Sequence, residues 1–436
     1  MFNFLKQEIM KKLLLLAPIA VLALASCSND EQIAQSPALN AQEVTFRPVV
    51  NGTTRTITTD ANFTGFTVEA SITNGGTYAF WKGVDATVPS AAPTAEGSVK
   101  NSLTLPVTKD PTSGKWELLD GARWYWSSKN AEASFIGYTE KGEVSVAEDV
   151  ASQKDVLVAY NKGAASSFDN GVPMLFRHVL SQIVVKADNK DADIRQIKVA
   201  AVRFHNFGKT NTLTLPSSET TADNFKWYDA TSATDGYKPW AGNPTTQSEK
   251  WTYYKNVVDN TAKYAGAGDA ITLNASAQEI TFKGAVLMLP QTNAAAASSD
   301  FVQTGTNTAN PNANGKAYID VLIQVQAIGT AANTTDTWKN AIYPTIASTE
   351  TTLTNQLFAW VAVPVEFDWK PGYKYTYVLH FSENGIGKIS PDTTGGDDDP
   401  DPGHEPGEDV VDNPVPLYFT VTIDEWNDAA KIEKDL

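Results

Sequence analysis

Residues 417–423 read Leu-Tyr-Phe-Thr-Val-Thr-Ile, and this short stretch decides how the rest of the sequence is interpreted. Successive side chains of a β-strand point to opposite faces, so Leu417, Phe419, Val421 and Ile423 share one face and the Tyr and Thr side chains share the other. An isolated strand that is apolar at alternate positions needs a sheet edge to pair with. We therefore expect a strand here that completes a β-sheet.

The segment before this strand has a different composition from the rest of the chain. Residues 391–412 contain nine acidic residues, no Lys or Arg, and several Pro and Gly. Such a segment repels itself and cannot bury a core, which predicts a flexible linker over 391–413. The strand, within 414–436, can therefore fold back on its own chain or pair with another.

Acidic residues inside the linker partly match a calcium-binding loop. Asp397, Asp399, Asp401 and Glu408 stand at relative positions 1, 3, 5 and 12. Pro402 occupies the position at which the turn of that loop needs Gly. We interpret the segment as solvated linker and predict no metal site.

Upstream of the linker, short apolar or alternating runs are separated by Gly, Asn, Pro and Asp, as is typical of strands and turns. The predicted strands include residues 44–46, 66–68, 77–81, 133–138, 156–159, 180–185, 197–204, 285–289, 318–325, 358–365 and 373–381. Residues 205–270 and 291–315 are predicted to be long surface loops. Because no long segment has helical periodicity, we expect an all-β fold of antiparallel sandwiches.

The N-terminus predicts export from the cytoplasm. Two lysines precede an apolar run over residues 13–24, which is too short to span a membrane comfortably, so residues 1–27 are interpreted as a signal peptide. Its end, Leu-Ala-Ser-Cys, resembles a lipoprotein signal in which Cys27, the one cysteine of the chain, becomes the lipidated first residue. An ordinary cleaved signal is the alternative. Residues 28–43 are polar and are interpreted as a tether.

Charge and motif content exclude several classes of function. The net charge of −16 repels phosphate backbones, so nucleic acid is not an expected partner. The sequence has no nucleophile elbow, zinc-protease helix motif, phosphate loop or dinucleotide fingerprint, and we predict neither an enzyme nor a cofactor. His178 and His380 lie within strand patterns, where we expect packed, hydrogen-bonded side chains rather than catalysts.

An aromatic cluster leaves two interpretations open. Trp124 and Trp126 fall on one face of a predicted strand and Tyr125 on the other. If that face is exposed, it could stack against sugars. Aromatic side chains in sandwich strands more often form the core.

Taken in order, several motifs resemble the fimbrillin family of Bacteroides-type pili. They are the lipoprotein signal, Val44-Thr45-Phe46 with Thr53-Thr54-Arg55, Ala122-Arg123-Trp124-Tyr125-Trp126, Asp155-Val156-Leu157-Val158-Ala159, Phe176-Arg177-His178-Val179-Leu180-Ser181, Trp369-Lys370-Pro371-Gly372-Tyr373-Lys374-Tyr375-Thr376-Tyr377 and Val421-Thr422-Ile423-Asp424-Glu425-Trp426. Their order extends over nearly the whole chain.

The resemblance implies two transthyretin-like antiparallel β-sandwich domains, 44–172 and 173–390. It also implies a structural subunit, stalk or anchor, of a cell-surface fimbrium, which reaches the outer membrane as a lipoprotein and associates with other pilin subunits. The alternative is a tip or accessory adhesin that binds a host glycan or protein. A short Asp-Thr signal at Thr393 resembles an O-glycosylation site of Bacteroides-type bacteria.

The resemblance further implies assembly by strand exchange. A trypsin-like protease cuts after Arg55 and removes the first strand, residues 44–54, with Arg47 as a less favourable position for the cut. The C-terminal strand of another subunit, residues 415–424, then fills the vacated groove. The groove-filling side chains of the removed strand are Val44, Phe46, Pro48 and Val50, and those of the donor strand are Leu417, Phe419, Val421 and Ile423.

Overall fold

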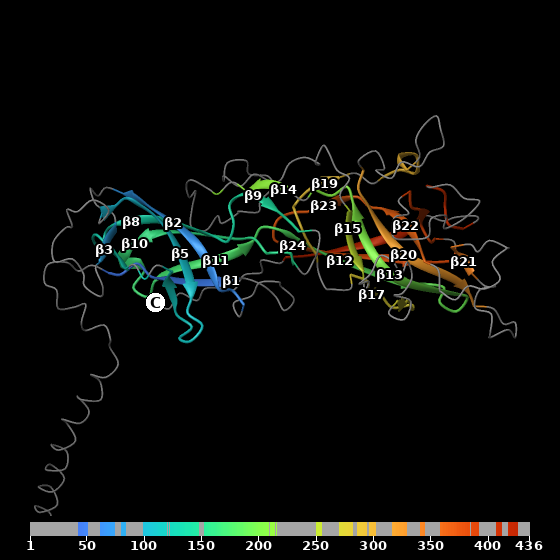
Figure 1. Ribbon diagram of the computed structural model, residues 1–436, viewed down its shortest axis with the longest axis horizontal. Helices are drawn as coiled ribbons and strands as arrows, with labels where there is room; N and C mark the ends of the chain where they lie inside the picture. The colour runs from blue at the N-terminus through green and yellow to red at the C-terminus, as the bar shows by residue number, and fades with distance from the viewer. Residues whose placement is uncertain are drawn as a thin grey trace, which may run out of the picture. The chain divides into compact units, whose positions relative to one another are not determined.

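A computed structural model (Figure 1) describes residues 42–50, 62–74, 80–83, 99–119, 121, 123–147, 152–208, 210–213, 215, 250–254, 270–281, 286–293, 296–301, 316–328, 341–344, 358–383, 385–391, 407–411 and 417–425. Cys27, Arg55 and Thr393 lie outside these residues, as do the acidic positions of the partial calcium loop up to Asp401.

The described residues form strands and two short 3₁₀ helices, Ala165–Ser167 and Ser298–Asp300, which confirms the all-β prediction. The strands are β1 (Phe46–Val50), β2 (Gly65–Asn74), β3 (Phe80–Gly83), β4 (Val99–Lys100), β5 (Ser102–Lys109), β6 (Trp116–Leu118), β7 (Arg123–Trp126), β8 (Glu132–Tyr138), β9 (Gly142–Ser145), β10 (Leu157–Ala164), β11 (Val172–His178), β12 (Ser181–Asn189), β13 (Arg195–His205), β14 (Thr210–Leu213), β15 (Lys250–Tyr254), β16 (Ile271–Thr272), β17 (Gln278–Glu279), β18 (Val286–Met288), β19 (Thr292–Asn293), β20 (Tyr318–Ala327), β21 (Ala341–Tyr343), β22 (Ala359–Pro364), β23 (Phe367–Asp368), β24 (Tyr373–Phe381), β25 (Lys388–Ile389) and β26 (Tyr418–Glu425). Within the same residues, no helix has the length and apolarity to cross a membrane.

The chain divides into two compact units. The first comprises residues up to 47, 68–135 and 162–173, and the second comprises 48–67, 136–161 and 174–436. One seven-stranded sheet has the order β1-β11-β10-β8-β2-β5-β6, and β1, β2, β8, β10 and β11 each supply residues to both units. The division into domains 44–172 and 173–390 stays a prediction.

An aromatic cluster forms the core of the first unit. Trp126 lies 5.6 Å from Phe80, 5.6 Å from Phe135 and 6.1 Å from Phe168, measured between ring centroids. Phe46 of β1 meets Phe135 edge to face at 5.9 Å. Offset and edge-to-face pairs at such distances stabilise a core beyond the area that they bury.

Two packed sheets form the body of the second unit. One has the order β17-β12-β24-β26 with β18 beside β12, and the other has the order β15-β13-β20-β22-β25, of which β13, β20 and β22 lie side by side in Figure 1. Alternate side chains of both sheets meet in one large apolar core, as in a β-sandwich.

One pairing in this sandwich differs from the antiparallel expectation. Strands β12 and β24 run parallel over eight consecutive Cα pairs, from Gln182↔Lys374 to Asn189↔Phe381. Alternation in a sequence assigns side chains to faces but does not determine the neighbour of a strand or its direction, so this pair was missed.

The sequence motifs meet in space around the start of this parallel pair. The buried side chains of His178 and Asp155 are joined by a contact of 2.7 Å between Nδ1 and Oδ2. The Ser181 hydroxyl donates to the carbonyl of Lys370 at 2.9 Å, and the Gly372 N–H donates to the carbonyl of Leu180 at 2.9 Å. These motifs therefore contribute to the fold, and the expectation that His178 is a packed, hydrogen-bonded residue is confirmed.

Parts of two predicted loops and of the predicted linker are ordered. Strands β14 and β15 lie within 205–270, and β19 lies within 291–315. Gly407–Val411 belongs to the predicted linker but packs on β25: Ile389 makes two backbone hydrogen bonds of 2.8 Å with it, and Val410 is buried. Val410 and Val411 anchor the segment to the apolar core. The prediction rested on the average composition of the linker, which does not show a local apolar pair.

A charged cluster is buried in the second unit on β13 and β20. The side chains of Arg203 and Asp320 are 1% and 0% exposed, and Nη2 and Nε of Arg203 each lie 2.9 Å from Oδ2 of Asp320. His205 and the Ser390 hydroxyl contact the same oxygen at 2.9 and 2.8 Å. Burial opposes ionisation of Asp320, but Arg203, His205 and Ser390 outweigh it and lower the pKa of this carboxyl group.

We predict that Asp320→Asn lowers the free energy of unfolding by about 3 kcal/mol, because it leaves the Arg203 charge buried without a counter-charge. Urea denaturation measures the effect. A lowered pKa gives stability that is present above the ordinary carboxyl range and is lost as the pH falls through the lowered pKa. The difference between wild type and variant should therefore narrow below about pH 4.

Asp368→Asn is the control. Asp368 is 64% exposed and lies 3.9 Å from Lys370, and exposed pairs of this kind contribute about 0–1 kcal/mol. Equal effects of the two substitutions would contradict the role assigned to the buried cluster.

Candidate strand-exchange surfaces

The first described segment is held by strands on both sides. The Val44 N–H donates to the carbonyl of Trp124 at 2.7 Å, and the Trp126 N–H donates to the carbonyl of Gln42 at 2.8 Å. One residue further on, the carbonyl of Thr45 accepts from the Val172 N–H at 2.8 Å. The segment thus pairs first with β7 and then with β11.

A glycine makes the close approach to β11 possible. Gly171 has a φ of +89°, a left-handed conformation that L side chains rarely adopt. A Cβ at this position would lie 2.8 Å from the Thr45 hydroxyl and 3.3 Å from its backbone. The chain therefore has no room for a side chain where the first segment passes.

Strand β1 buries most of its apolar face. Val44, Phe46 and Val50 are 2%, 7% and 5% exposed, and Pro48 is half-buried. The Arg47 side chain is exposed, but its backbone lies within β1. Loss of β1 would uncover the core groups that these side chains contact, Phe135 among them.

Strand β26 lies along β24 of its own chain. Eight antiparallel Cα pairs join them, from Tyr373↔Glu425 to His380↔Tyr418. The fold-back arrangement, one of two that the sequence left open, is therefore the arrangement in this structure. A strand at the end of a sheet presents backbone groups that can pair with another chain.

The apolar face of β26 is only partly covered. Leu417 and Phe419 pack against the large core, and the Phe419 ring lies 5.9 Å from that of Tyr377. Val421 and Ile423 occupy the same face but are 39% and 58% exposed. The pairing with β24 thus leaves Ile423 mostly in solvent and Val421 partly so.

Strand β24 provides a rigid support for β26. Trp369 Nε1 donates to the Tyr377 hydroxyl and the Lys370 N–H donates to the Tyr375 hydroxyl, both at 2.8 Å. Burial raises the pKa of Tyr375 to about 12, so this phenol stays neutral at all physiological pH values. The Trp-Lys-Pro-Gly-Tyr motif therefore fixes the strand on which the C-terminal strand lies.

The aromatic run on β7 is not a sugar-binding surface. Trp124, Tyr125 and Trp126 are 5%, 1% and 1% exposed, because both faces of this strand are covered. The hypothesis of an exposed stacking face is therefore wrong. Within the described residues, no group of three or more His, Cys, Asp or Glu side chains is placed to hold a metal ion.

The described strands define an all-β protein of the β-sandwich class, with its first and last described strands at sheet edges. A fimbrillin-like family model matches residues 54–395, and the chain belongs to this family. It is therefore a pilus-related protein of the cell-surface fimbrium that associates with other pilin subunits, and it is a structural protein rather than an enzyme. The match begins after β1 and ends before β26, so it does not include either strand.

Solved structures show a more distant similarity. A fimbrial protein from Bacteroides vulgatus is 12% identical with a TM-score of 0.43, over 88% of this chain and 99% of that chain. A candidate cell adhesion protein from Bacteroides ovatus is 11% identical with a TM-score of 0.38, over 88% and 98%. One from Parabacteroides distasonis is 9% identical with a TM-score of 0.36, over 88% and 99%. No curated protein matches the sequence.

The different burial of the two edge strands predicts different mutational effects in the monomer. Phe46→Ala should lower the free energy of unfolding by about 3 kcal/mol, as for other buried Phe side chains. Ile423→Ala should lower it by less than about 1 kcal/mol, because the side chain is already 58% exposed. Urea denaturation of the unprocessed monomer compares them, and a larger effect at Ile423 would show that β26 is buried in solution.

Proposed function

We propose that this protein is a stalk or anchor subunit of the fimbrium and polymerises by protease-triggered strand exchange. Cleavage after Arg55 releases β1, and β26 of a neighbouring subunit takes its place. The uneven burial of the two strands carries the proposal. Residues 44–50, which include β1, fill their groove with Val44, Phe46 and Val50, whereas β26 leaves Val421 39% and Ile423 58% exposed on its own chain.

The energetics favour transfer of β26 into the vacated groove. Full burial of an aliphatic side chain contributes about 1.5–3 kcal/mol, and Val421 and Ile423, which are 39% and 58% exposed on β24, gain only part of this there. Backbone pairing lost on leaving β24 is regained in the new sheet, as in β-strand addition generally. The net gain comes from the apolar side chains, which supports exchange only after the groove has been emptied.

The position of Arg47 supports cleavage at Arg55 instead. Arg47 lies within β1, flanked by the buried Phe46, so its backbone is held in the strand. Arg55 follows β1 in the sequence and lies outside the described residues. Proteases cut paired strands less readily than unpaired chain, so the pairing of β1 disfavours a cut at Arg47.

A stalk or anchor role fits better than a tip role. A tip subunit has no need of a donor strand, and the proposal gives that role to β26 in this chain. The sequence signal for a glycan-binding face was the tryptophan pair on β7, and both side chains are buried. No other described feature favours the adhesin alternative.

We predict that Arg55→Ala leaves the protein on the cell as an unpolymerised lipoprotein, while Arg47→Ala polymerises normally. Gel electrophoresis of surface material in SDS without boiling distinguishes ladders from monomers. Ile423→Ala combined with intact processing should shorten the ladders. Normal ladders from both variants would refute exchange triggered by cleavage at either arginine. Normal ladders from Arg55→Ala with none from Arg47→Ala would show that the protease cuts after Arg47 instead.

The lipid anchor is a second part of the proposal. Cys27 is the one cysteine and ends a lipoprotein-like signal, so acylation there would hold the precursor in the outer membrane. We predict that mass spectrometry of the precursor finds an acylated N-terminal Cys27, and that Cys27→Ala abolishes both acylation and retention in the membrane fraction. An unmodified mature N-terminus would indicate an ordinary signal. The same spectrum would show any glycan on Thr393 as added mass.

A further inference from the structure

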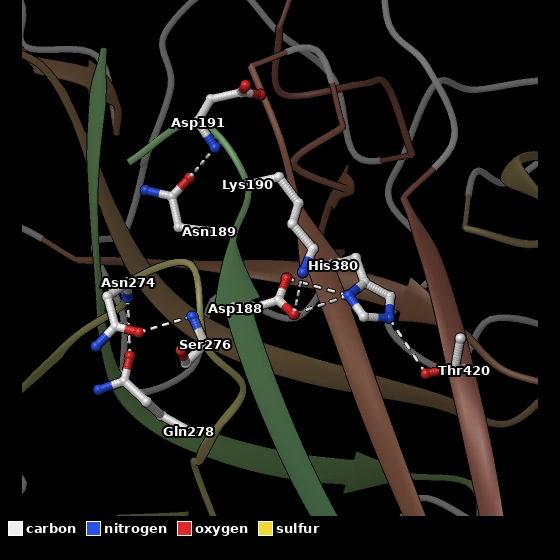
Figure 2. Close-up of polar contacts among 9 residues, drawn as sticks. All are labelled: Asp188, Asn189, Lys190, Asp191, Asn274, Ser276, Gln278, His380 and Thr420. Atoms are coloured by element: carbon white, nitrogen blue, oxygen red, sulfur yellow. Dashed lines mark hydrogen bonds and ion pairs between the residues drawn. The ribbon is translucent and has the colours of Figure 1, made fainter. Parts of the chain in front are cut away.

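Three neighbouring strands are linked by a line of polar side chains on one face of their sheet (Figure 2). His380 on β24 places Nδ1 2.9 and 3.1 Å from the carboxylate oxygens of Asp188 on β12. Its Nε2 lies 3.2 Å from the hydroxyl of Thr420 on β26. Thr420 is thus bonded by its side chain to the strand from which β26 must separate.

Asp188 is built to orient the imidazole. Its side chain is 2% exposed, and Lys190 Nζ contacts Oδ2 at 2.8 Å. A carboxylate only accepts, so the proton of a neutral His380 lies on Nδ1. Nε2 is then an acceptor directed at Thr420, and the hydroxyl donates to it.

The register of β26 on β24 needs such a fixed point. A shift by two residues keeps every side chain on its face. The Thr-Val-Thr-Ile run, residues 420–423, nearly repeats itself after two residues, so this part of β26 distinguishes the registers less well than Leu417 and Phe419, which pack against the core. In the observed register Asp424 stands opposite Lys374, and Thr420 reaches His380.

We infer that Asp188 and His380 are positioning residues that hold Thr420, fix the register of β26 on β24, and set how often β26 leaves its own subunit. The last part rests on the proposed strand exchange. The family is structural, so the Asp-His-Thr order is assigned to strand retention and not to nucleophilic chemistry.

Thr420→Val tests the inference, since it replaces the hydroxyl with a methyl group and keeps a β-branched side chain on an exposed face. Thr422→Val is the matched control: it lies on the same face of the same strand, opposite Thr376. Amide hydrogen exchange of residues 417–425 in the unprocessed full-length protein should accelerate about two- to tenfold in Thr420→Val, the ratio expected for one net hydrogen bond. It should not accelerate in Thr422→Val.

Asp188→Asn provides a second readout, the tautomer of His380, which a general loss of packing would not change. The variant should change the tautomer of His380, seen in the ¹⁵N shifts of its ring, and accelerate exchange in β26 by a similar factor. Unchanged exchange in Thr420→Val, or equal acceleration in Thr422→Val, would overturn the inference.

A parallel assay separates this inference from the proposed function. Ladder formation after processing is followed for wild type and Thr420→Val. Faster amide hydrogen exchange of β26 in Thr420→Val, without any ladders in wild type, would support the positioning role but exclude strand exchange as its purpose. Ladders in wild type, together with equal amide hydrogen exchange of β26 in wild type and Thr420→Val, would support strand exchange and remove the positioning role. Faster exchange and faster ladder formation together support both.

Discussion

The parallel pairing of β12 with β24 is the constraint on which the second unit depends. Parallel strands cannot be joined by a hairpin, so Ser181–Asn189 and Tyr373–Phe381 pair across a long intervening stretch of the chain. The motif contacts of Ser181 and Gly372 lie at the start of this pair. On its other side β24 carries β26, so the C-terminal strand depends on a pairing that forms between distant parts of the sequence.

Local alternation was enough to locate most strands. Residues 373–381 were predicted to their ends, and those at 133–138 and 318–325 to within two residues, because turn residues interrupt the pattern at each side. The packed roles of His178 and His380 also followed, since a histidine within a strand needs a hydrogen-bond partner when it is buried. The family resemblance also singled out a series of motifs, and the described fold shows that several of them contact one another.

Features that depend on partners distant in sequence could not be predicted in this way. The Arg203–Asp320 pair looks, residue by residue, like two solvent-facing charges in apolar strands. The two tryptophans of β7 follow the correct alternation, yet which faces are covered is decided by other segments. The contact of Thr420 with His380 requires both a register and a neighbouring strand, neither of which alternation specifies.

The docking of Gly407–Val411 on β25 limits how far β26 can travel. While Val410 stays in the core, the seven residues from Val411 to Leu417 allow the start of β26 to move no more than about 25 Å from Val410. In the proposed strand exchange, a recipient subunit beyond that distance is accessible only if this segment detaches as well. The spacing between successive subunits along the fibre would then depend on whether Gly407–Val411 stays docked on β25 or detaches.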